Sequence, residues 1–321
     1  MNFDRHEEVR DFLVQTWGKE KACYIASIWH QNVKNPSRGK WDVTPLVRKV
    51  SEHITALALS ADNVDSQVPV FSNPETQHLC TQWTAENIEA AGLLRFDLLG
   101  LASLDKLQTV LTQLGQQGIR LNPADLPLTD KKNLQLFQEG NTEGIDGFSS
   151  ERCIATLRKL QPQSFYDLVI LFALYRPGPL QKLLPVFLEN QKNPKNISYI
   201  HPDLKAVLED TKGVLVFDTQ IAGIVERWTG LNRAQAENFR RGLLKFDEIH
   251  REGLRADFIK KGFLQNRSAE DSSKVFDFIA RNLLYTFGKA HALAHILVSW
   301  RLAYLKANYT SQWHEALVSF E

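Results

Sequence analysis

The stretch Gly92–Leu101 reads GLLRFDLLGL and places one carboxylate, Asp97, inside an otherwise apolar run. A continuous apolar run of this length is typical of a strand that is buried on both faces, here ending in a turn at Gly100. An acid in such a run can close the strand or cap a helix. It can also be a metal ligand at a phosphoryl-transfer centre, where carboxylates at strand ends hold divalent cations. The run alone leaves both interpretations open.

Composition limits the class of protein. The chain has 321 residues, of which 43% are hydrophobic, so it can bury a full core divided into two or three lobes. No apolar run approaches the about 20 residues that cross a membrane, and the charged residues at 4–8 are unlike a signal peptide, so we expect a cytoplasmic protein with no membrane partner. The net charge of +1 means that a nucleic-acid surface would need local clustering of Lys and Arg.

The three cysteines, Cys23, Cys80 and Cys153, lie far apart and form no CxxC pair. This spacing indicates neither a structural zinc site nor a disulfide framework. We expect all three to be buried apolar side chains.

The pattern of apolar residues changes near Gly100. Before it, we expect helices at 6–18, 44–59 and 84–91 and strands at 22–28, 78–83 and 93–97; Pro45 suits the first turn of the second helix. After it, helical periodicity recurs with Gly, Pro or Asn between segments. The expected helices are 104–114, 130–137, 152–160, 164–175, 180–190, 202–209, 219–228, 233–246, 250–263, 269–287, 290–309 and 311–320. The sequence therefore predicts an α+β protein that is mostly α, a small mixed lobe followed by a large irregular helical domain.

Three short strings in the helical part carry candidate phosphate-binding cations. YRPGP at 175–179 is a rigid turn that fixes the position of Arg176, although it also reads as a plain helix-ending turn. NFRRGLLKFD at 238–247 places Arg240 and Arg241 about a hundred degrees apart on a helix, either as a solvated face or as a phosphate clamp. FGKAH at 287–291 puts Lys289 and His291 in the first turn of a helix, where anions bind.

Two other kinds of site are not indicated. His291 and His295 have the spacing of a two-histidine zinc site, but no glutamate stands between them to act as a base, so we expect core or interface histidines. Neither GxxxxGKS nor GxGxxG occurs, which sets aside the nucleotide-binding folds that depend on those loops.

A set of strings in one order resembles the alpha subunit of bacterial DNA polymerase III, the replicative C-family polymerase. The strings are FDLLGL, DLPLTDKKNLQLF, TLRKLQP, YRPGPL, ISYIHPDLKAVLEDTKGVLVF, NFRRGL and FGKAHALAHILVSWRLAYLKANY. The resemblance covers residues 76 to the end, and 3–28 less closely. It implies a partial palm-like part at 1–30, a reduced thumb-like insertion at 31–75, a palm-like strand region at 76–105 and a fingers-like helical domain at 106–321.

The resemblance also implies a chemistry. In that family three palm aspartates hold magnesium ions for nucleotidyl transfer, and Asp97 falls at the third of them. The other two form a DxD pair expected just before the helix at His6, where Asn2 and Phe3 are the nearest match. We therefore expect a truncated and divergent chain that also lacks the glycine–serine segment that cups the triphosphate.

The cationic positions Arg176, Arg240, Arg241, Lys289 and His291 match the family, but other positions depart from it. Three family strings are replaced in this chain, at residues 146–150, 217–220 and 243–247. At 243–247 the family has a run of lysines. Residues 201–321 hold 17 Lys and Arg against 15 Asp and Glu, so the basic excess expected of a template channel is gone.

The leading hypothesis is a polymerase-derived palm and fingers protein that is inactive alone and binds nucleic acid, a nucleotide or a protein partner. It requires no cofactor, and Mg²⁺ would bind only if other ligands joined Asp97, since one carboxylate cannot balance two hard cations. One alternative is an active nucleotidyltransferase that completes its metal site with Asp4, Asp42 or a partner chain. Another is an interaction subunit without nucleic-acid binding, using apolar surface around Trp300, Tyr304 and Trp313.

Overall fold

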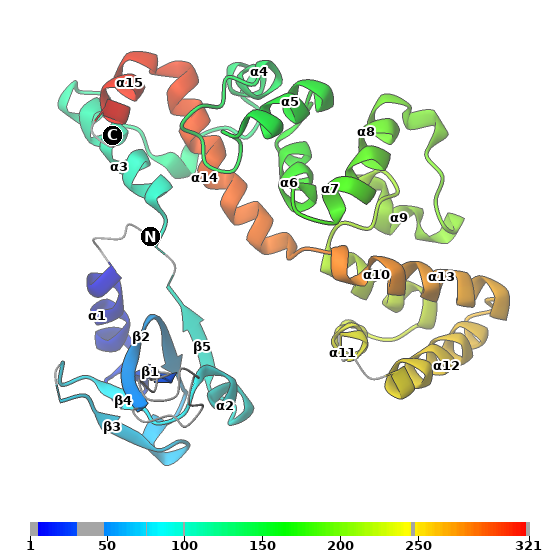
Figure 1. The fold of residues 1–321 in the computed structure, drawn as a ribbon, viewed down its shortest axis with the longest axis horizontal. Coiled ribbons are helices and arrows are strands. Elements are labelled where there is room, and N and C mark those ends of the chain that lie inside the picture. The colour runs from blue at the N-terminus through cyan, green and yellow to red at the C-terminus, as the bar shows by residue number, and fades with distance from the viewer. Residues whose placement is uncertain (1–5, 31–47, 75, 99, 245–247, 319–321) are drawn as a thin grey trace, which may run out of the picture. The chain divides into compact units, whose positions relative to one another are not determined.

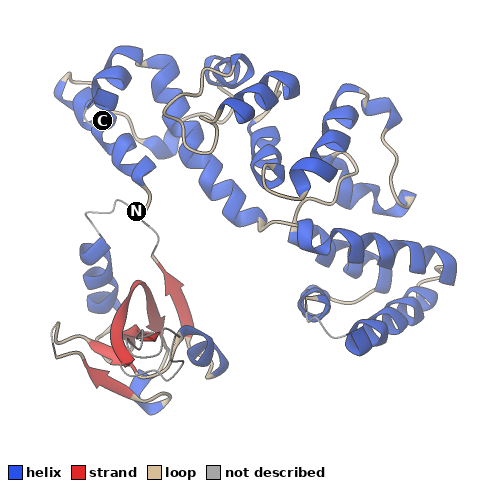
Figure 2. Cartoon of the chain, viewed as in Figure 1, coloured by secondary structure: helices blue, strands red, loops and turns tan. Residues whose placement is uncertain are grey.

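The computed structural model describes residues 6–30, 48–74, 76–98, 100–244 and 248–318 (Figure 1). The chain divides into two compact units, residues 1–105 and 106–321, and each is described by itself. Strands occur in the first unit and the second is built from helices, which confirms the predicted α+β, mostly α class (Figure 2).

The first unit is a mixed five-stranded sheet with helices. Its elements are α1 (His6–Trp17), β1 (Ala22–His30), β2 (Arg48–Leu59), a 3₁₀ turn (Val64–Ser66), β3 (Val70–Ser72), β4 (Leu79–Thr81), α2 (Ala85–Ala90) and β5 (Leu94–Asp97). The strand order is β3-β4-β1-β2-β5. β1 runs parallel to β4, and the other neighbouring pairs are antiparallel.

Two small cores cover the two faces of this sheet. Strand side chains point alternately to opposite faces, so neighbours in sequence enter different cores. The core on the α1 face contains Leu13, Tyr24, Leu57, Cys80 and Leu98. The core on the other face contains Cys23, Ile25, Ala56, Ala58, Val64, Val68, Ile88 and Leu93. Cys153 is also buried, so the expectation for all three cysteines is confirmed.

Two predictions for the first unit are wrong. The helix expected at 44–59 is strand β2 over residues 48–59, which pairs with β1 along much of its length. The β-branched residues Val50, Ile54 and Thr55 favour this extended pairing over a helix, whereas Pro45, which suggested the helix, lies outside the described residues. The expected buried strand is β5, an edge strand of four residues in which Leu94, Phe96 and Asp97 are exposed.

The second unit consists of helices joined by short turns. Its α-helices are α3 (Ala102–Gln116), α4 (Lys131–Glu139), α5 (Glu151–Leu160), α6 (Phe165–Leu174), α7 (Pro179–Lys182), α8 (Leu184–Lys192), α9 (Lys205–Leu208), α10 (Asp218–Thr229), α11 (Arg233–Leu243), α12 (Glu248–Leu264), α13 (Ala269–Asn282), α14 (Lys289–Asn308) and α15 (Thr310–Val318); α3 begins at the end of the first unit. Side chains of Asp130, Ser150, Ser164, Asn232 and Ser268 cap five of them by accepting a backbone N–H three residues later. Within the described ranges, no helix is long and apolar enough to span a bilayer.

Helix α14 forms the centre of one part of this unit and packs against α6, α4 and α15. Its Trp300 is buried, with the ring stacked on Phe137 at 6.0 Å between centroids and the indole Nε1 donating to the Pro127 carbonyl at 3.0 Å. The buried Asn133 side chain donates to the Trp300 carbonyl at 2.9 Å. A second core, built from α10 to α13, surrounds Trp228 and Phe258.

Trp300, Tyr304 and Trp313 do not form the exposed apolar surface that the interaction-subunit alternative expected. Trp300 and Trp313 are both fully buried, and only Tyr304 is partly exposed. The prediction was wrong because the three aromatic residues were assigned to a surface without knowledge of the helices that cover them.

Replacing Trp300 by alanine should lower the free energy of unfolding by about 3–5 kcal/mol, because it opens a cavity and removes the indole hydrogen bond. Urea unfolding followed by circular dichroism measures the loss. Phe263→Ala is the matched control, since the Phe263 side chain is exposed and its removal should cost less than about 0.5 kcal/mol. Equal losses for the two variants would contradict the central role of Trp300.

Candidate functional site

Asp97 is the last residue of β5, and its carboxylate is paired with Arg95 of the same strand. The Arg95 guanidinium donates to Asp97 Oδ1 from Nη2 at 2.9 Å and from Nε at 3.1 Å. The Asp97 side chain is 39% exposed. The acid is thus at the strand end, as both interpretations required, and Arg95 occupies one of its two carboxylate oxygens.

In the part of the chain that the structure describes, no group of three or more His, Cys, Asp or Glu side chains is placed to hold a metal ion. The described residues therefore do not fit a two-metal centre. Asp4 and Asp42, as well as Asn2 and Phe3, lie outside the described residues, so a site that includes them stays a prediction.

In the helical unit, a backbone bridge brings two helix starts together. Phe287 N–H donates to the Val216 carbonyl at 2.9 Å, and Asp218 N–H donates to the Phe287 carbonyl at 3.1 Å. Helix α10 begins at Asp218 and α14 begins at Lys289, directly beside this bridge. Helix starts carry partial positive charge, so two such ends lie next to each other here.

Lys289 occupies the start of α14. Its Nζ lies 5.1 Å from the ring centroid of Tyr166 and 5.8 Å from that of Phe217, which holds the ammonium group over two aromatic faces. Gly288 precedes the helix and supplies no side-chain cap. The first backbone N–H groups of α14 thus have no side-chain cap, and the residue that begins the helix carries a positive charge.

His291 lies in the same first turn and is exposed. Its ring lies 5.4 Å from that of Phe287 and 4.6 Å from that of His295, measured between centroids. The His295 ring stacks on Phe172 at 5.3 Å. Burial and the neighbouring His291 lower the pKa of His295, with Asp146 acting in the opposite direction, so His295 is a neutral packing residue at neutral pH.

The Arg176 side chain has a fixed position in the YRPGP turn, as the sequence predicts, but its guanidinium binds groups of the protein itself. Its guanidinium donates to the carbonyls of Ala173 at 2.9 Å, of Thr286 at 2.7 Å and of Tyr285, and it lies 5.0 Å from the Phe287 ring centroid. Burial lowers the pKa of Arg176. The side chain therefore fixes the segment that leads into α14, and it is a positioning residue for Lys289 and His291.

The paired arginines on α11 are unequal. The Arg240 side chain is 15% exposed and donates two hydrogen bonds to the Glu237 carboxylate, from Nε at 2.9 Å and from Nη2 at 2.7 Å. The Arg241 side chain is 71% exposed and donates one hydrogen bond to the same carboxylate, from Nε at 3.2 Å. The Arg240 hydrogen bonds hold the pKa of Glu237 down at about 2. Glu237 and, more weakly, Asp218 raise the pKa of Arg240. Arg241 is thus the member of the pair that is available to a ligand.

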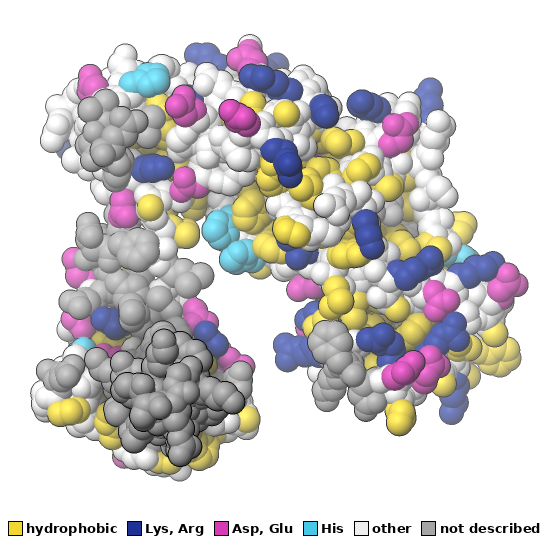
Figure 3. Space-filling model, in the orientation of Figure 1, with side chains coloured by type: hydrophobic (Ala, Val, Ile, Leu, Met, Phe, Trp, Pro, Cys, Tyr) yellow, Lys and Arg dark blue, Asp and Glu magenta, His cyan; other side chains and the backbone are white. Residues whose placement is uncertain are grey.

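Three of the predicted cationic residues lie against the rings of the Phe217–Phe287 bridge: Arg176 and His291 against Phe287, and Lys289 against Phe217. Arg240 is paired with Glu237 on α11. Arg241 lies on the exposed side of α11. On the face drawn in Figure 3, Lys and Arg side chains are mixed with Asp and Glu side chains over the helical unit. Asp97 belongs to the first unit and is described apart from them.

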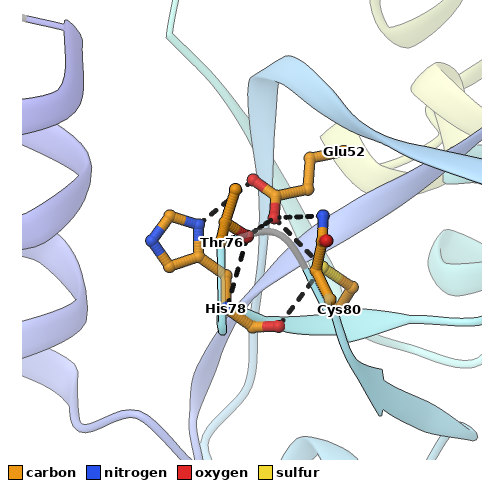
Figure 4. A network of polar contacts seen from close by, with 5 residues as sticks. Glu52, Thr76, His78 and Cys80 are labelled. Carbon is orange, nitrogen blue, oxygen red and sulfur yellow. Dashed lines mark hydrogen bonds and ion pairs between the residues drawn. The ribbon is translucent and has the colours of Figure 1, made fainter.

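One polar network in the first unit was not predicted from the sequence. Glu52 of β2 accepts hydrogen bonds from Asn73 at 2.7 Å, from Thr76, and from His78 Nδ1 at 3.1 Å, and Cys80 Sγ lies 3.8 Å from it (Figure 4). Burial raises the pKa of Cys80 to about 12, so this thiol is inert. In the sequence, the only sign of this network is that His78 and Cys80 are two residues apart in an expected strand and so share one face. Their partner, Glu52, lies in the segment that was predicted to be a helix.

The pairing of Glu237 with Arg240 predicts a defined pH dependence. Because folding lowers the pKa of Glu237 from 4.5 to about 2, the pair stabilises the protein fully above pH 4.5 and loses this effect as the pH falls toward 2. The stability difference between the wild type and Glu237→Gln should therefore shrink over that range. Urea midpoints measured at several pH values test this, and Arg240→Gln should lose part of the same pH dependence, because Arg241 still pairs with Glu237. A difference that stays constant with pH would contradict it.

Comparison with known proteins gives matches over both units. A family model described as the finger domain of the bacterial DNA polymerase III alpha subunit matches residues 101–266. A second, described as the bacterial DNA polymerase III alpha NTPase domain, matches residues 40–100.

Individual relatives agree. The chain is 33% identical to DNA polymerase III subunit alpha of Halalkalibacterium halodurans over 278 residues, which are 86% of this chain and 25% of that protein. The protein of the same name from Bacillus subtilis is 31% identical over 82% of this chain and 24% of its own length. The protein of the same name from Rickettsia prowazekii is 31% identical over 86% of this chain and 23% of its own length.

The chain spans about a quarter of the length of these relatives. The matched ranges include Asp97, Arg176, Arg240 and Arg241, which the sequence had singled out. The resemblance drawn from the seven sequence strings is thereby confirmed. The chain belongs to the family of the alpha subunit of bacterial DNA polymerase III.

Proposed function

We propose that the helical unit binds phosphate groups of nucleic acid or of a nucleotide at the start of α14. The observation that carries this proposal is the Phe217–Phe287 bridge, which sets the starts of α10 and α14 side by side with Lys289 above it. Phosphate oxygens accept hydrogen bonds from free N–H groups at a helix start, and the helix dipole favours their charge.

The remaining cations have separate roles in this proposal. Lys289 and His291 face the ligand from the first turn of α14, and the exposed Arg241 of α11 adds a further phosphate contact. Arg176 and Arg240 are committed to protein groups, so they hold the segments in place. The near balance of Lys and Arg with Asp and Glu at 201–321 supports a few specific phosphate contacts rather than a long basic channel.

We also propose that the chain alone does not catalyse nucleotidyl transfer. The Asp97 carboxylate is paired with Arg95, and the described residues place no cluster of metal ligands around it. An arginine on the carboxylate competes with a divalent cation for the same oxygen. Under this proposal Mg²⁺ and other cofactors are not required. A protein partner and a cytoplasmic location remain expectations that follow from the polymerase family.

Primed DNA incubated with the protein, nucleotides and Mg²⁺ or Mn²⁺ should show no extension above that of Asp97→Ala. The reason is that a single carboxylate cannot hold two metal ions against phosphate repulsion. Denaturing gel electrophoresis of the labelled primer is the measurement. Extension that disappears in Asp97→Ala would instead establish the alternative in which Asp4, Asp42 or a partner completes the site.

Binding to fluorescent single-stranded or primed DNA should weaken roughly tenfold in Lys289→Ala and in Arg241→Ala, which is about 1.4 kcal/mol each. The slope of log affinity against log salt should fall by about 1 per lost phosphate contact. Anisotropy titrations at several salt concentrations measure both. Lys274→Ala is the matched control, because Lys274 is an exposed lysine of α13 paired with Glu270, away from the bridge.

Two further outcomes concern the identity of the bound group and the alternative of an interaction subunit. Deoxynucleoside triphosphates that compete with DNA at the same residues identify the bound group as phosphate, whichever molecule carries it. An absence of DNA and nucleotide binding at low salt would overturn the proposal and favour the interaction subunit.

A further inference from the structure

Strand β5 lies at one edge of the described sheet of the first unit and carries exposed apolar side chains. Among the described residues, β5 forms strand pairs with β2 alone. Leu94 and Phe96 point to the α1 face and are 61% and 40% exposed. An exposed edge strand with large apolar side chains is a template for pairing with another strand, and soluble proteins usually protect it with charges or a covering segment.

The apolar surface extends from β5 to α1. Leu94 and Trp17 both line an open groove of about 540 Å³, together with Thr16, Lys21, Leu59, Ser60, Ala61 and Gly92. Trp17 is exposed, and so is Phe12, whose carbonyl accepts a hydrogen bond from Thr16 one turn later. Trp17 and Leu94 therefore lie at one groove, Phe96 lies on the same face of β5 as Leu94, and we call these three residues the β5 patch. Contiguous apolar patches of this kind mark interaction sites.

The charges on β5 indicate which strand fits this edge. Arg95 and Asp97 lie on the face opposite to Leu94 and Phe96, because side chains alternate along a strand. In an antiparallel pair, residues directly opposite each other share one face. A partner strand should therefore place an acid opposite Arg95, a base opposite Asp97, and an apolar residue opposite Phe96.

Strand β5 itself has this pattern when it is read in the reverse direction. We propose that two copies of the chain pair through β5 in an antiparallel register centred on Phe96. In this register Arg95 faces Asp97 of the second copy, Asp97 faces Arg95 of the second copy, and the two Phe96 side chains meet on the two-fold axis. The contact is isologous and closed, so it produces a dimer and no longer chain of subunits.

The neighbouring registers are less favourable on charge alone. A register centred on Arg95 would place two arginines directly opposite each other, and like charges in that position destabilise a pair. A register centred between Arg95 and Phe96 would set Leu94 against Asp97 and so mix apolar with charged side chains on one face. The Phe96-centred register alone matches both faces of β5, and it joins the β5 patches of the two copies.

This dimer is independent of the proposed phosphate site, because it uses the first unit and none of Lys289, His291 or Arg241. It also gives the Arg95–Asp97 pair a role outside metal binding. Within one copy the two side chains already form an ion pair at 2.9 Å. In the dimer the same four charges become two cross-strand pairs, which fix the register.

Charge-exchanged variants test the register directly. Sedimentation velocity over a range of concentrations should show a concentration-dependent dimer for the wild type. Arg95→Asp alone sets four acids at the axis, and Asp97→Arg alone sets four bases there, so each variant should sediment as a monomer. An equimolar mixture of the two variants should form a heterodimer, because each acid then faces a base. Circular dichroism shows whether each variant is folded before mixing.

A cysteine at the axis gives a second, independent measurement. Residues opposite each other in an antiparallel pair have Cα atoms about 4.5–5.5 Å apart, within the range of a disulfide. Phe96→Cys should therefore form a disulfide-linked dimer under mild oxidation, whereas Leu94→Cys should not, since position 94 does not face itself. The three native cysteines are buried and do not compete. Phe263→Asp, an exposed apolar position of the helical unit, is the control and should leave the dimer intact.

A wild-type protein that stays monomeric at its highest soluble concentration would overturn the proposal. So would a dimer that persists in both single charge variants, because that dimer would use another surface. Failure of the two folded variants to associate on mixing, or crosslinking of Leu94→Cys as readily as Phe96→Cys, would also exclude the Phe96-centred register.

Discussion

Two backbone hydrogen bonds, which join Val216 and Asp218 to Phe287, hold the starts of α10 and α14 together, and the candidate site is built around them. Each bond replaces an amide–water contact, so the bridge adds only about 1 kcal/mol per bond to stability. Its importance lies in geometry. It fixes Lys289 over Tyr166 and Phe217, and Arg176 secures the segment before α14 through backbone carbonyls. A helix start without a side-chain cap is thus kept in one orientation by groups that do not themselves bind a ligand.

The sequence predicted those features that depend on local pattern. The start of α14 at Lys289 followed from the FGKAH string. The strand carrying Asp97 was placed correctly because Gly92 and Gly100 bound it. Family membership followed from the order of seven strings, which no single string could establish.

Features that depend on tertiary contacts were beyond this reasoning. Strand β2 was assigned as a helix because its extended form is selected by pairing with β1, a contact between distant segments. Arg176 and Arg240 were predicted to be phosphate-binding cations, and only the structure shows that backbone carbonyls and Glu237 already bind them. The Glu52 network joins β2 to the turn at 73–80, so it could not be seen while β2 was misassigned.

Helix α14 connects the candidate site to the core as one stiff body. Its 20 residues extend over about 30 Å, and along this length His295 stacks on Phe172, Ser299 donates to the Asp146 carbonyl and Lys306 donates to the Glu143 carbonyl. A rod fixed at several points cannot tilt at one end without disturbing the others. Under the proposed function, an anion at Lys289 therefore meets a helix end that cannot tilt unless the side chains around Trp300 repack.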